Sequence, residues 1–431
     1  MNIPKFNSAD EFLQQFNRTS VLSAELSETV FDIIQTVRKD GDSALRKYTS
    51  RFDGVDRASI GVTDADWDAV SDIDDETLNL FSGAAENIQV YHEKEAEQEQ
   101  DWTLGDAKTY VGQRVTPLKR VGVYVPGGTA AYPSTVLMNV IPAKVAGVEE
   151  IALVSPPMKE NGILNPLVLA AARILGVTEI YAVGGAQAVA ALAYGTESIP
   201  PVDKIIGPGN QYVNEAKRQV FGQVGIESLA GPSEILIIAD ESANPEYLAA
   251  DLLSQAEHDP QARPILIATD AELLERTDGE LQSQLATLPR RDIAGASLEN
   301  EGALIKVESL EEAIDLANFI APEHLELDVA EPEKLMPKIR SAGCIFVGRY
   351  TPEPVGDYWA GSNHILPTAG SARYASALSV RDFIRRTSVV KYDEETLRNM
   401  GSEITRFARL EGLDAHARAV EQRTGKAVVN E

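Results

Sequence analysis

The alternation of short apolar runs with longer amphipathic segments, from residue 121 onward, constrains the fold of this chain most strongly. The segments between the runs are long enough to form helices that cross back over a sheet, and this rhythm is typical of parallel βαβ units. The sequence therefore predicts an α/β protein with two Rossmann-like parallel-sheet modules and with helical N-terminal and C-terminal extensions. The apolar runs stand at 121–125, 150–155, 179–184 and 203–207 in a first series, and at 234–240, 264–269, 303–307 and 344–348 in a second.

Breaks rich in glycine and proline set the predicted domain limits. Gly207-Pro208-Gly209 punctuates the first series, and Gly231-Pro232 separates it from the second. Residues 1 to about 120 are polar, with apolar positions at helical spacing, and a further helical piece follows from about Asp393. We expect an N-terminal extension (1–20), a first Rossmann-like module with a helical N-terminal part (21–123 and 234–378), a second Rossmann-like module with a nucleotide cleft (124–233) and a C-terminal helical segment (379–431).

Charge and cysteine content exclude several classes of function. With 39 basic and 66 acidic residues the net charge is −27, which repels phosphate backbones and anionic lipids, so we expect no nucleic-acid or membrane partner. The N-terminus carries no secretory apolar segment, and this predicts a cytoplasmic location. The only cysteine, Cys344, stands in an apolar run and is interpreted as a small buried side chain, not a catalytic thiol.

Three glycine-bearing turns follow strands of the first series, at 124–128, 183–187 and 207–210. Ligands of parallel sheets bind beyond the carboxyl ends of the strands, and glycine lets the backbone approach them closely. Each turn by itself fits a plain tight turn, and none matches the dinucleotide pattern GxGxxG. Three such turns in one module, each beside a polar or aromatic residue (Tyr124, Gln187, Asn210), favour a nucleotide cleft.

The histidines supply the candidates for metal binding and acid–base chemistry. His258 shares a helical face with Gln255, as two metal ligands would, although a histidine at a helix end also fits the helix dipole. His324 follows Glu323, and the two form either an acid–base couple or a hydrogen-bonded turn. Asp357 and His364 lie in a Gly- and aromatic-rich loop over 349–374, His416 lies near the C-terminus, and His92 is interpreted as a surface residue. Gln, His, Asp and His without cysteine suit zinc, manganese or cobalt, but spacing alone does not show that they meet.

Eight long motifs in one order resemble the histidinol dehydrogenase family over nearly the whole chain. The resemblance implies oxidation of L-histidinol to L-histidine through L-histidinal, in histidine biosynthesis, with two NAD and one Zn²⁺ per subunit. The motifs are YVPGG (124–128), VGGAQA (183–188), GPGN (207–210), AGPSE (230–234), LLSQAEH (252–258), PEHLEL (322–327), GDYWAGSNHILPT (356–368) and EGLDAH (411–416).

The same resemblance assigns roles to individual residues. Glu323 and His324 look like the catalytic acid–base pair, and Tyr124, Gln187 and Asn210 look like NAD contacts. The residues that look like zinc ligands are Gln255, His258, Asp357 and His416, and those that would surround the substrate are Ser233, Gln255, His258, His324, Asp357, His364, Glu411 and His416.

The resemblance also implies a homodimer in which the C-terminal segment (379–431) completes the neighbouring subunit's site. One departure is Asp259, because the family usually has glycine after the motif histidine. Oxidation of the aldehyde could proceed through a thiohemiacetal or through water attack, and the position of Cys344 in a predicted core strand favours water. Two alternatives are a non-catalytic protein that binds metal or nucleotide on the same scaffold, and a relative that acts on another amino alcohol.

Overall fold

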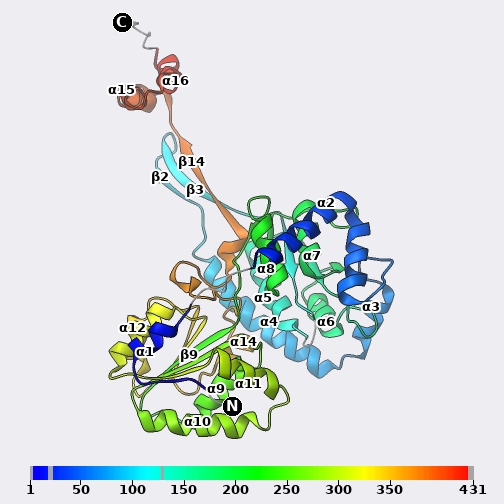
Figure 1. The fold of residues 1–431 in the computed structure, drawn as a ribbon. Helices are drawn as coiled ribbons and strands as arrows, with labels where there is room; N and C mark the ends of the chain where they lie inside the picture. The colour runs from blue at the N-terminus through cyan, green and yellow to red at the C-terminus, as the bar shows by residue number, and fades with distance from the viewer. Residues whose placement is uncertain (1–2, 18–22, 128–130, 426–431) are drawn as a thin grey trace. The chain divides into compact units, whose positions relative to one another are not determined.

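The computed structural model describes residues 3–17, 23–127 and 131–425, and these form two compact units (Figure 1). The first unit comprises Met1–Glu95 and Leu118–Phe383, and the second comprises Ala96–Pro117 and Ile384–Glu431. Gly128 of the motif at 124–128 and parts of the predicted extension over 1–20 lie outside the described residues. Within the described ranges, no helix is both long enough and apolar enough to cross a membrane.

The four runs of the first series, with the short strand β8 that the sequence did not indicate, form a fully parallel five-stranded sheet of order β6-β5-β4-β7-β8 in the first unit. The chain starts in the middle at β4, runs outward through β5 and β6, and returns to the other side of β4, which is the doubly wound order of a Rossmann half. Its strands are β4 (Arg120–Tyr124), β5 (Glu150–Ser155), β6 (Glu179–Ala182), β7 (Lys204–Ile206) and β8 (Gly225–Ile226), and its helices are α5 (Pro133–Ala146), α6 (Pro166–Ile174), α7 (Gly185–Tyr194) and α8 (Gln211–Val220).

The four runs of the second series, together with β12, repeat this order around β9 in a parallel sheet β1-β11-β10-β9-β12-β13, to which the N-terminal segment adds the edge strand β1. Both sheets of the first unit are therefore Rossmann-like, and the predicted fold class is confirmed. The strands are β1 (Lys5–Phe6), β9 (Glu234–Ala239), β10 (Arg263–Ala268), β11 (Ala303–Lys306), β12 (His324–Asp328) and β13 (Cys344–Val347), and the helices are α1 (Ala9–Gln15), α9 (Pro245–Ala256), α10 (Ala271–Leu285), α11 (Arg291–Asn300), α12 (Leu310–Ile320), α13 (Pro332–Leu335) and α14 (Glu353–Tyr358).

Three N-terminal helices, α2 (Ala24–Asp53), α3 (Asp64–Asp68) and α4 (Asp75–Ala96), complete the helical part of the first unit. The apolar positions of α2, such as Val30 and Ile33, are buried in one core with the helices of the five-stranded sheet. Helix α2 lies beside α7 and α8 (Figure 1), so this N-terminal helix covers a face of the sheet. Short 3₁₀ turns lie at Ala69–Asp72, Met336–Lys338, Ser371–Arg373 and Val380–Phe383.

The second unit combines an antiparallel sheet, β14-β3-β2, with the two C-terminal helices. The sequence predicts a mostly helical segment over residues 1–120, and it gives no sign of the hairpin that β2 and β3 form. Both faces of these strands are largely exposed in this chain, so they lack the alternation that marks a half-buried strand. The elements are β2 (Trp102–Gly105), β3 (Tyr110–Pro117), β14 (Ile384–Lys391), α15 (Glu394–Leu410) and α16 (Asp414–Thr424).

The predicted domain limits stay a prediction. The limit drawn between residues 123 and 124 falls on the last residue of β4, so the strand that opens the five-stranded sheet starts before it. The predicted limits also group residues 96–117 with the N-terminal helices. In the structure, β3 pairs along its whole length with the C-terminal strand β14.

Candidate functional sites

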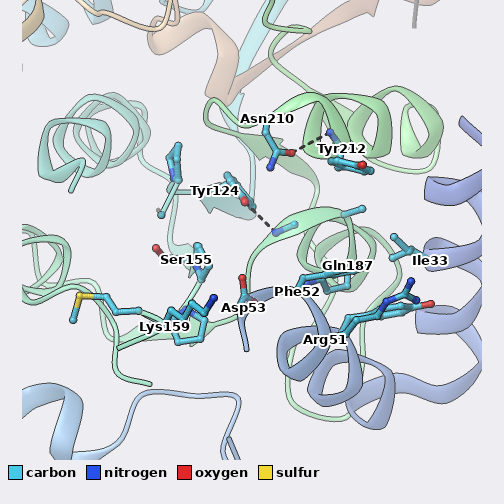
Figure 2. Close-up of a pocket in the computed structure, with 18 of the residues that line it drawn as sticks. Ile33, Arg51, Phe52, Asp53, Tyr124, Ser155, Lys159, Gln187, Asn210 and Tyr212 are labelled. Atoms are coloured by element: carbon cyan, nitrogen blue, oxygen red, sulfur yellow. Dashed lines mark hydrogen bonds between the residues drawn. The ribbon is translucent and has the colours of Figure 1, made fainter. Parts of the chain in front are cut away.

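A cavity of about 930 Å³ lies at the carboxyl ends of β4, β5, β6 and β7, the edge at which the sequence predicted a nucleotide cleft (Figure 2). Its volume is that of a typical small-molecule or cofactor site. The end of helix α2 closes one side of it. Lining residues from α2 include Ile33, Tyr48, Arg51, Phe52 and Asp53, and those from the strand ends include Tyr124, Pro126, Gly127, Ser155, Pro156, Lys159, Gly185, Gln187, Asn210 and Tyr212.

The three predicted NAD contacts, Tyr124, Gln187 and Asn210, all line this cavity. Tyr124 accepts a hydrogen bond from the Gly185 N–H at 3.0 Å, and burial raises the pKa of its phenol to about 12, so its O–H stays protonated and can donate. The Asn210 Oδ1 caps α8 by accepting from the Tyr212 N–H at 3.0 Å, which leaves its amide N–H groups for a ligand. The buried Gln187 Oε1 has no hydrogen-bond partner in the described part of the chain, as expected of a group that meets a ligand.

A buried ion pair holds the backbone of the turn that carries Asn210. Gly207 has a φ of +109°, and a Cβ there would lie 2.1 Å from the Tyr124 carbonyl oxygen, so only glycine fits. Lys217 donates to the Gly207 carbonyl at 3.1 Å and to Glu227 at 2.7 Å, while Glu227 accepts from the Gly207 N–H at 2.8 Å. The Lys217–Glu227 pair therefore positions the third glycine turn.

Glu323 and His324 lie at the amino end of β12, the edge opposite to the one that sequence reasoning favours for ligands of a parallel sheet. Both side chains form hydrogen bonds with the backbone of Glu234, at the start of β9. Glu323 Oε2 accepts from the Glu234 N–H at 2.8 Å, and His324 Nδ1 lies 2.9 Å from the Glu234 carbonyl oxygen. Since a carbonyl only accepts, Nδ1 carries the proton toward Glu234, and Nε2 is left as the basic nitrogen.

The free nitrogen of His324 faces two carboxylates of α14. Nε2 lies 3.7 Å from Asp357 Oδ1 and 4.0 Å from Glu353 Oε1, and it has no hydrogen-bond partner among the described residues. His324 and Glu323 are both buried, and Glu323 Oε2 lies 3.7 Å from His324 Nδ1. The structure thus brings together Glu323, His324 and Asp357.

Burial and mutual charge shift the pKa values of this group. Burial raises the pKa of Glu323 to about 8, which lets its carboxyl group exchange a proton near neutral pH. Burial lowers the pKa of His324, but Glu323, Asp357 and Glu353 outweigh it and raise that pKa to about 10. Burial also opposes ionisation of Asp357, yet the neighbouring His324 and His364 hold its pKa at about 2.

His258 and His364 belong to the same neighbourhood. Desolvation lowers the pKa of each, while the charge of Asp357 acts in the opposite direction on both. The charge of His324 also acts on both, so His258 and His364 lie within electrostatic range of His324 and Asp357. Neutral imidazole and carboxylate are the forms that bind a metal ion.

Gln255 contributes the clearest sign of a missing ligand. It lies near the end of α9, it is 1% exposed, and its Oε1 has no hydrogen-bond partner in the part of the chain that the structure describes. An uncompensated buried oxygen is costly, so a donor or a cation is expected to complete it. The donor set of Gln255, His258 and Asp357 therefore fits a divalent metal ion with open positions for a substrate.

Two further predicted residues, Glu411 and His416, belong to the second unit. Glu411 caps the C-terminus of α15, His416 stands in the first turn of α16, and both side chains are exposed. Ser233 is half-buried directly before β9, next to the Glu234 backbone that holds the acid–base pair.

Comparison with known proteins identifies the family. The family model described as histidinol dehydrogenase matches residues 16–424. The chain is 56% identical to the histidinol dehydrogenase of Geobacillus kaustophilus over 403 residues, covering 93% of this chain and 95% of that one. It is 52% identical to the Bacillus subtilis enzyme, with 93% of each chain covered. The chain belongs to the histidinol dehydrogenase family. The crystal structure of histidinol dehydrogenase from Elizabethkingia anophelis superposes with a TM-score of 0.93, at 37% identity and 98% coverage of both chains.

Membership of the histidinol dehydrogenase family confirms the predicted family and the predicted enzyme class. The protein is an oxidoreductase of histidine biosynthesis that acts on histidinol. The roles of individual residues stay predictions.

The structure overturns one interpretation drawn from the sequence and adds one residue to the candidate site. His92 is fully buried, with Nδ1 2.7 Å from Glu95, so its interpretation as a surface residue is wrong. A helix of mixed charge gave no sign that this one position faces inward. Glu353 was missed because nothing in its spacing connects it with β12, yet His324, Glu353 and Asp357 form a group of potential metal ligands.

The structure also locates Cys344, which the sequence predicts to be a buried and unreactive thiol, and Asp259, the departure from the family pattern. Cys344 is half-buried beside His324 in the register of β12 and β13, and burial raises the pKa of its thiol to about 11, so it is not a thiolate near neutral pH. The Asp259 Oδ1 accepts from the Gln261 N–H at 2.8 Å, which occupies this carboxylate in a local turn.

Proposed function

We propose that this histidinol dehydrogenase converts L-histidinol to L-histidine through L-histidinal at one zinc-dependent site, using two NAD. The observation that supports it best is the unpartnered His324 Nε2, which faces Asp357 within a buried acid–base group. Buried groups of titratable side chains with shifted pKa values cluster at active sites, which favours catalysis over a role in binding alone. The number of NADH formed per histidinol tests the proposal directly.

The metal ligands proposed for Zn²⁺ are Gln255, His258 and Asp357, with His416 as the fourth. The unpartnered Gln255 oxygen and the low pKa values of His258 and Asp357 support the first three. A bound zinc ion would orient the imidazole and amine of the substrate and fix their charge state. His364 and Ser233 would complete the substrate's surroundings.

His324 is proposed as the base for the first oxidation. Its Nδ1–H is directed to the Glu234 carbonyl, so Nε2 is held toward the space beside Asp357. Because the neighbouring carboxylates raise the pKa of His324 to about 10, Nε2 must first lose its proton, as a cation bound by Asp357 would favour, and it can then accept the hydroxyl proton of the substrate. NAD, when bound, would accept the hydride that leaves the same carbon in each of the two oxidations.

Glu323 is proposed as the base for the second oxidation. Its ionised carboxylate would remove a proton from the water that adds to the aldehyde, giving the hydrate anion, and loss of hydride from this anion to NAD would give the acid. The alternative nucleophile, Cys344, is a protonated thiol because burial raises its pKa to about 11. Water attack therefore remains the preferred route.

The location that we propose for the reaction is the cytoplasm.

The cavity at β4 to β7 is proposed as the NAD site, with Tyr124, Gln187 and Asn210 as contacts. Tyr132, the N-cap of α5 after the β4 turn, and Asp357 both raise the pKa of Tyr358, so the two lie within electrostatic range of the same side chain. A cofactor that enters the cavity could thus extend toward the substrate.

The second unit is proposed as the dimer contact, because it lacks a core of its own. Its buried hydrophobic residues among those described are only Ala408 and Ala417. Helix α15 instead exposes a stripe of large apolar side chains at helical spacing, at Met400, Ile404 and Phe407. Such a surface needs a partner, and a second copy of this chain fits the family resemblance.

Complementation between inactive variants would test whether the partner completes each site. If Glu411 and His416 serve the neighbouring subunit, a mixed dimer of His258→Ala and His416→Ala chains collects both lesions in one site and none in the other. Mixed dimers purified through two different tags are therefore expected to recover about half of the wild-type turnover per dimer.

A second pair of variants provides the control. His258→Ala and Asp357→Ala both change the first unit, so their mixed dimer carries one lesion in every site and should stay inactive. Absence of recovery in verified His258→Ala and His416→Ala dimers would contradict the shared site without affecting the proposed chemistry.

A further inference from the structure

Asp53 is an acidic side chain in the proposed NAD cavity that the assigned roles do not use. It is the last residue of α2, directly before the left-handed cap Gly54, and it lines the cavity. Its Oδ2 is shielded from solvent and has no hydrogen-bond partner among the described residues. Figure 2 shows Asp53 between Lys159 and Gln187, on the side of the cavity formed by α2.

The position of Asp53 is unfavourable for the fold alone. A carboxylate at a helix C-terminus meets the negative end of the helix dipole. A carboxylate oxygen buried without a donor also loses hydration that nothing in the chain replaces. Burial accordingly raises the pKa of Asp53 to about 6. A residue that costs stability at a cavity wall points to a ligand that supplies the missing donors.

The chemistry of the cavity indicates what kind of donor is needed. Two buried oxygens without partners, Asp53 Oδ2 and Gln187 Oε1, line the same space, so the ligand must present hydrogen-bond donors to both. A carboxylate that accepts from adjacent hydroxyl groups is the common means by which proteins bind a ribose. The same carboxylate repels a phosphate placed on that ribose, because two negative charges would then meet in a poorly hydrated site.

The end of α2 also offers a surface for a base. The Phe52 ring stacks on Tyr48 with centroids 5.5 Å apart and an interplanar angle of 7°, and Phe52 remains half-exposed at the cavity. Glu323 and His324 are not among the described residues that line the cavity. The nicotinamide must reach that pair, so the α2 side is left for the adenosine end of the dinucleotide.

We propose that Asp53 accepts hydrogen bonds from the adenosine ribose of NAD and selects NAD against its 2′-phosphorylated form, NADP. The inference rests on the proposed NAD site and adds the residue that determines cofactor choice. Helix α2 would thereby contribute to a cofactor site that otherwise belongs to the strand ends of the five-stranded sheet.

Equilibrium binding of NAD and NADP to the substrate-free protein tests the role of Asp53. Asp53→Asn keeps the size of the side chain and removes its charge. We expect it to weaken NAD binding by about 10- to 100-fold, the range for loss of a hydrogen bond to a charged group, and to leave NADP binding within about threefold. The preference for NAD should thus fall by at least about threefold.

Thermal melting of the ligand-free protein provides a second readout. Because the buried charge at the helix end is unfavourable, Asp53→Asn is expected to melt at the same temperature as the wild type or higher. Asp56→Asn is the matched control: it removes one charge three residues away, at an exposed position, and should leave both affinities unchanged. An equal loss of NAD and NADP binding in Asp53→Asn would indicate a structural role and overturn the proposal.

Gln187→Ala separates failure of this inference from failure of the proposed NAD site. If Gln187→Ala weakens both dinucleotides while Asp53→Asn leaves their ratio unchanged, the NAD site stands and the role of Asp53 is refuted. If neither variant affects NAD binding, the cavity is not the cofactor site, and both proposals fail together.

Discussion

Glu323→Gln is expected to lower the rate of histidinal oxidation by roughly 10²- to 10⁴-fold, the usual range for loss of a general base. The amide oxygen can still accept from the Glu234 N–H, so the variant should keep the local structure. Oxidation of histidinol to the aldehyde should fall by a smaller factor, because His324 serves that step. The measurement is NADH formation after histidinal or histidinol is supplied separately.

Cys344→Ser is the control for this step. The thiol stands beside His324 in the strand register, but it is protonated and the proposed route uses water, so both oxidations should proceed at near wild-type rates. Aldehyde accumulation in Cys344→Ser, together with normal histidinal oxidation in Glu323→Gln, would show that the nucleophile is the cysteine.

Removal of the metal ion by a chelator is expected to reduce turnover by at least about 10²-fold, because a bound ion contributes several kcal/mol to such reactions. Added zinc or manganese should restore activity, and metal content measured by mass spectrometry should follow it. The expectation rests on the unpartnered Gln255 oxygen and on the group around Asp357.

Asp259→Gly is the matched variant for the metal prediction. The Asp259 carboxylate accepts from the Gln261 N–H in a local turn, so its replacement should leave the metal content unchanged, whereas Gln255→Ala should lower it. Full activity of protein shown to be free of metal would contradict the proposed metal site.

The sequence indicated the shared position of the residues in the proposed NAD cavity better than it indicated the position of Glu323 and His324. Tyr124, Gln187 and Asn210 follow successive parallel strands, and parallel strands bring such turns to one edge, so their common cavity could be expected. Glu323 and His324 precede β12 instead, and no periodicity indicates that the amino end of a strand will carry chemistry. The orientation of both side chains depends on hydrogen bonds to the backbone of Glu234 on the neighbouring strand β9.

Other features could not be read from the pattern because they depend on tertiary contacts. The burial of His92 follows from its packing near Asn363, far along the chain. The hairpin of β2 and β3 was missed because its faces are largely exposed in a single chain, and strand alternation reports burial. Asp53 resembles any other acidic residue at a helix end until the cavity beside it is known.

The stoichiometry of the complete reaction tests the central proposal most directly. With histidinol limiting and NAD in excess, the proposed two-step oxidation predicts two NADH for each histidinol consumed, with L-histidine as the only organic product. One NADH per histidinol, with histidinal as the final product, would contradict the proposal that a single site carries out both oxidations.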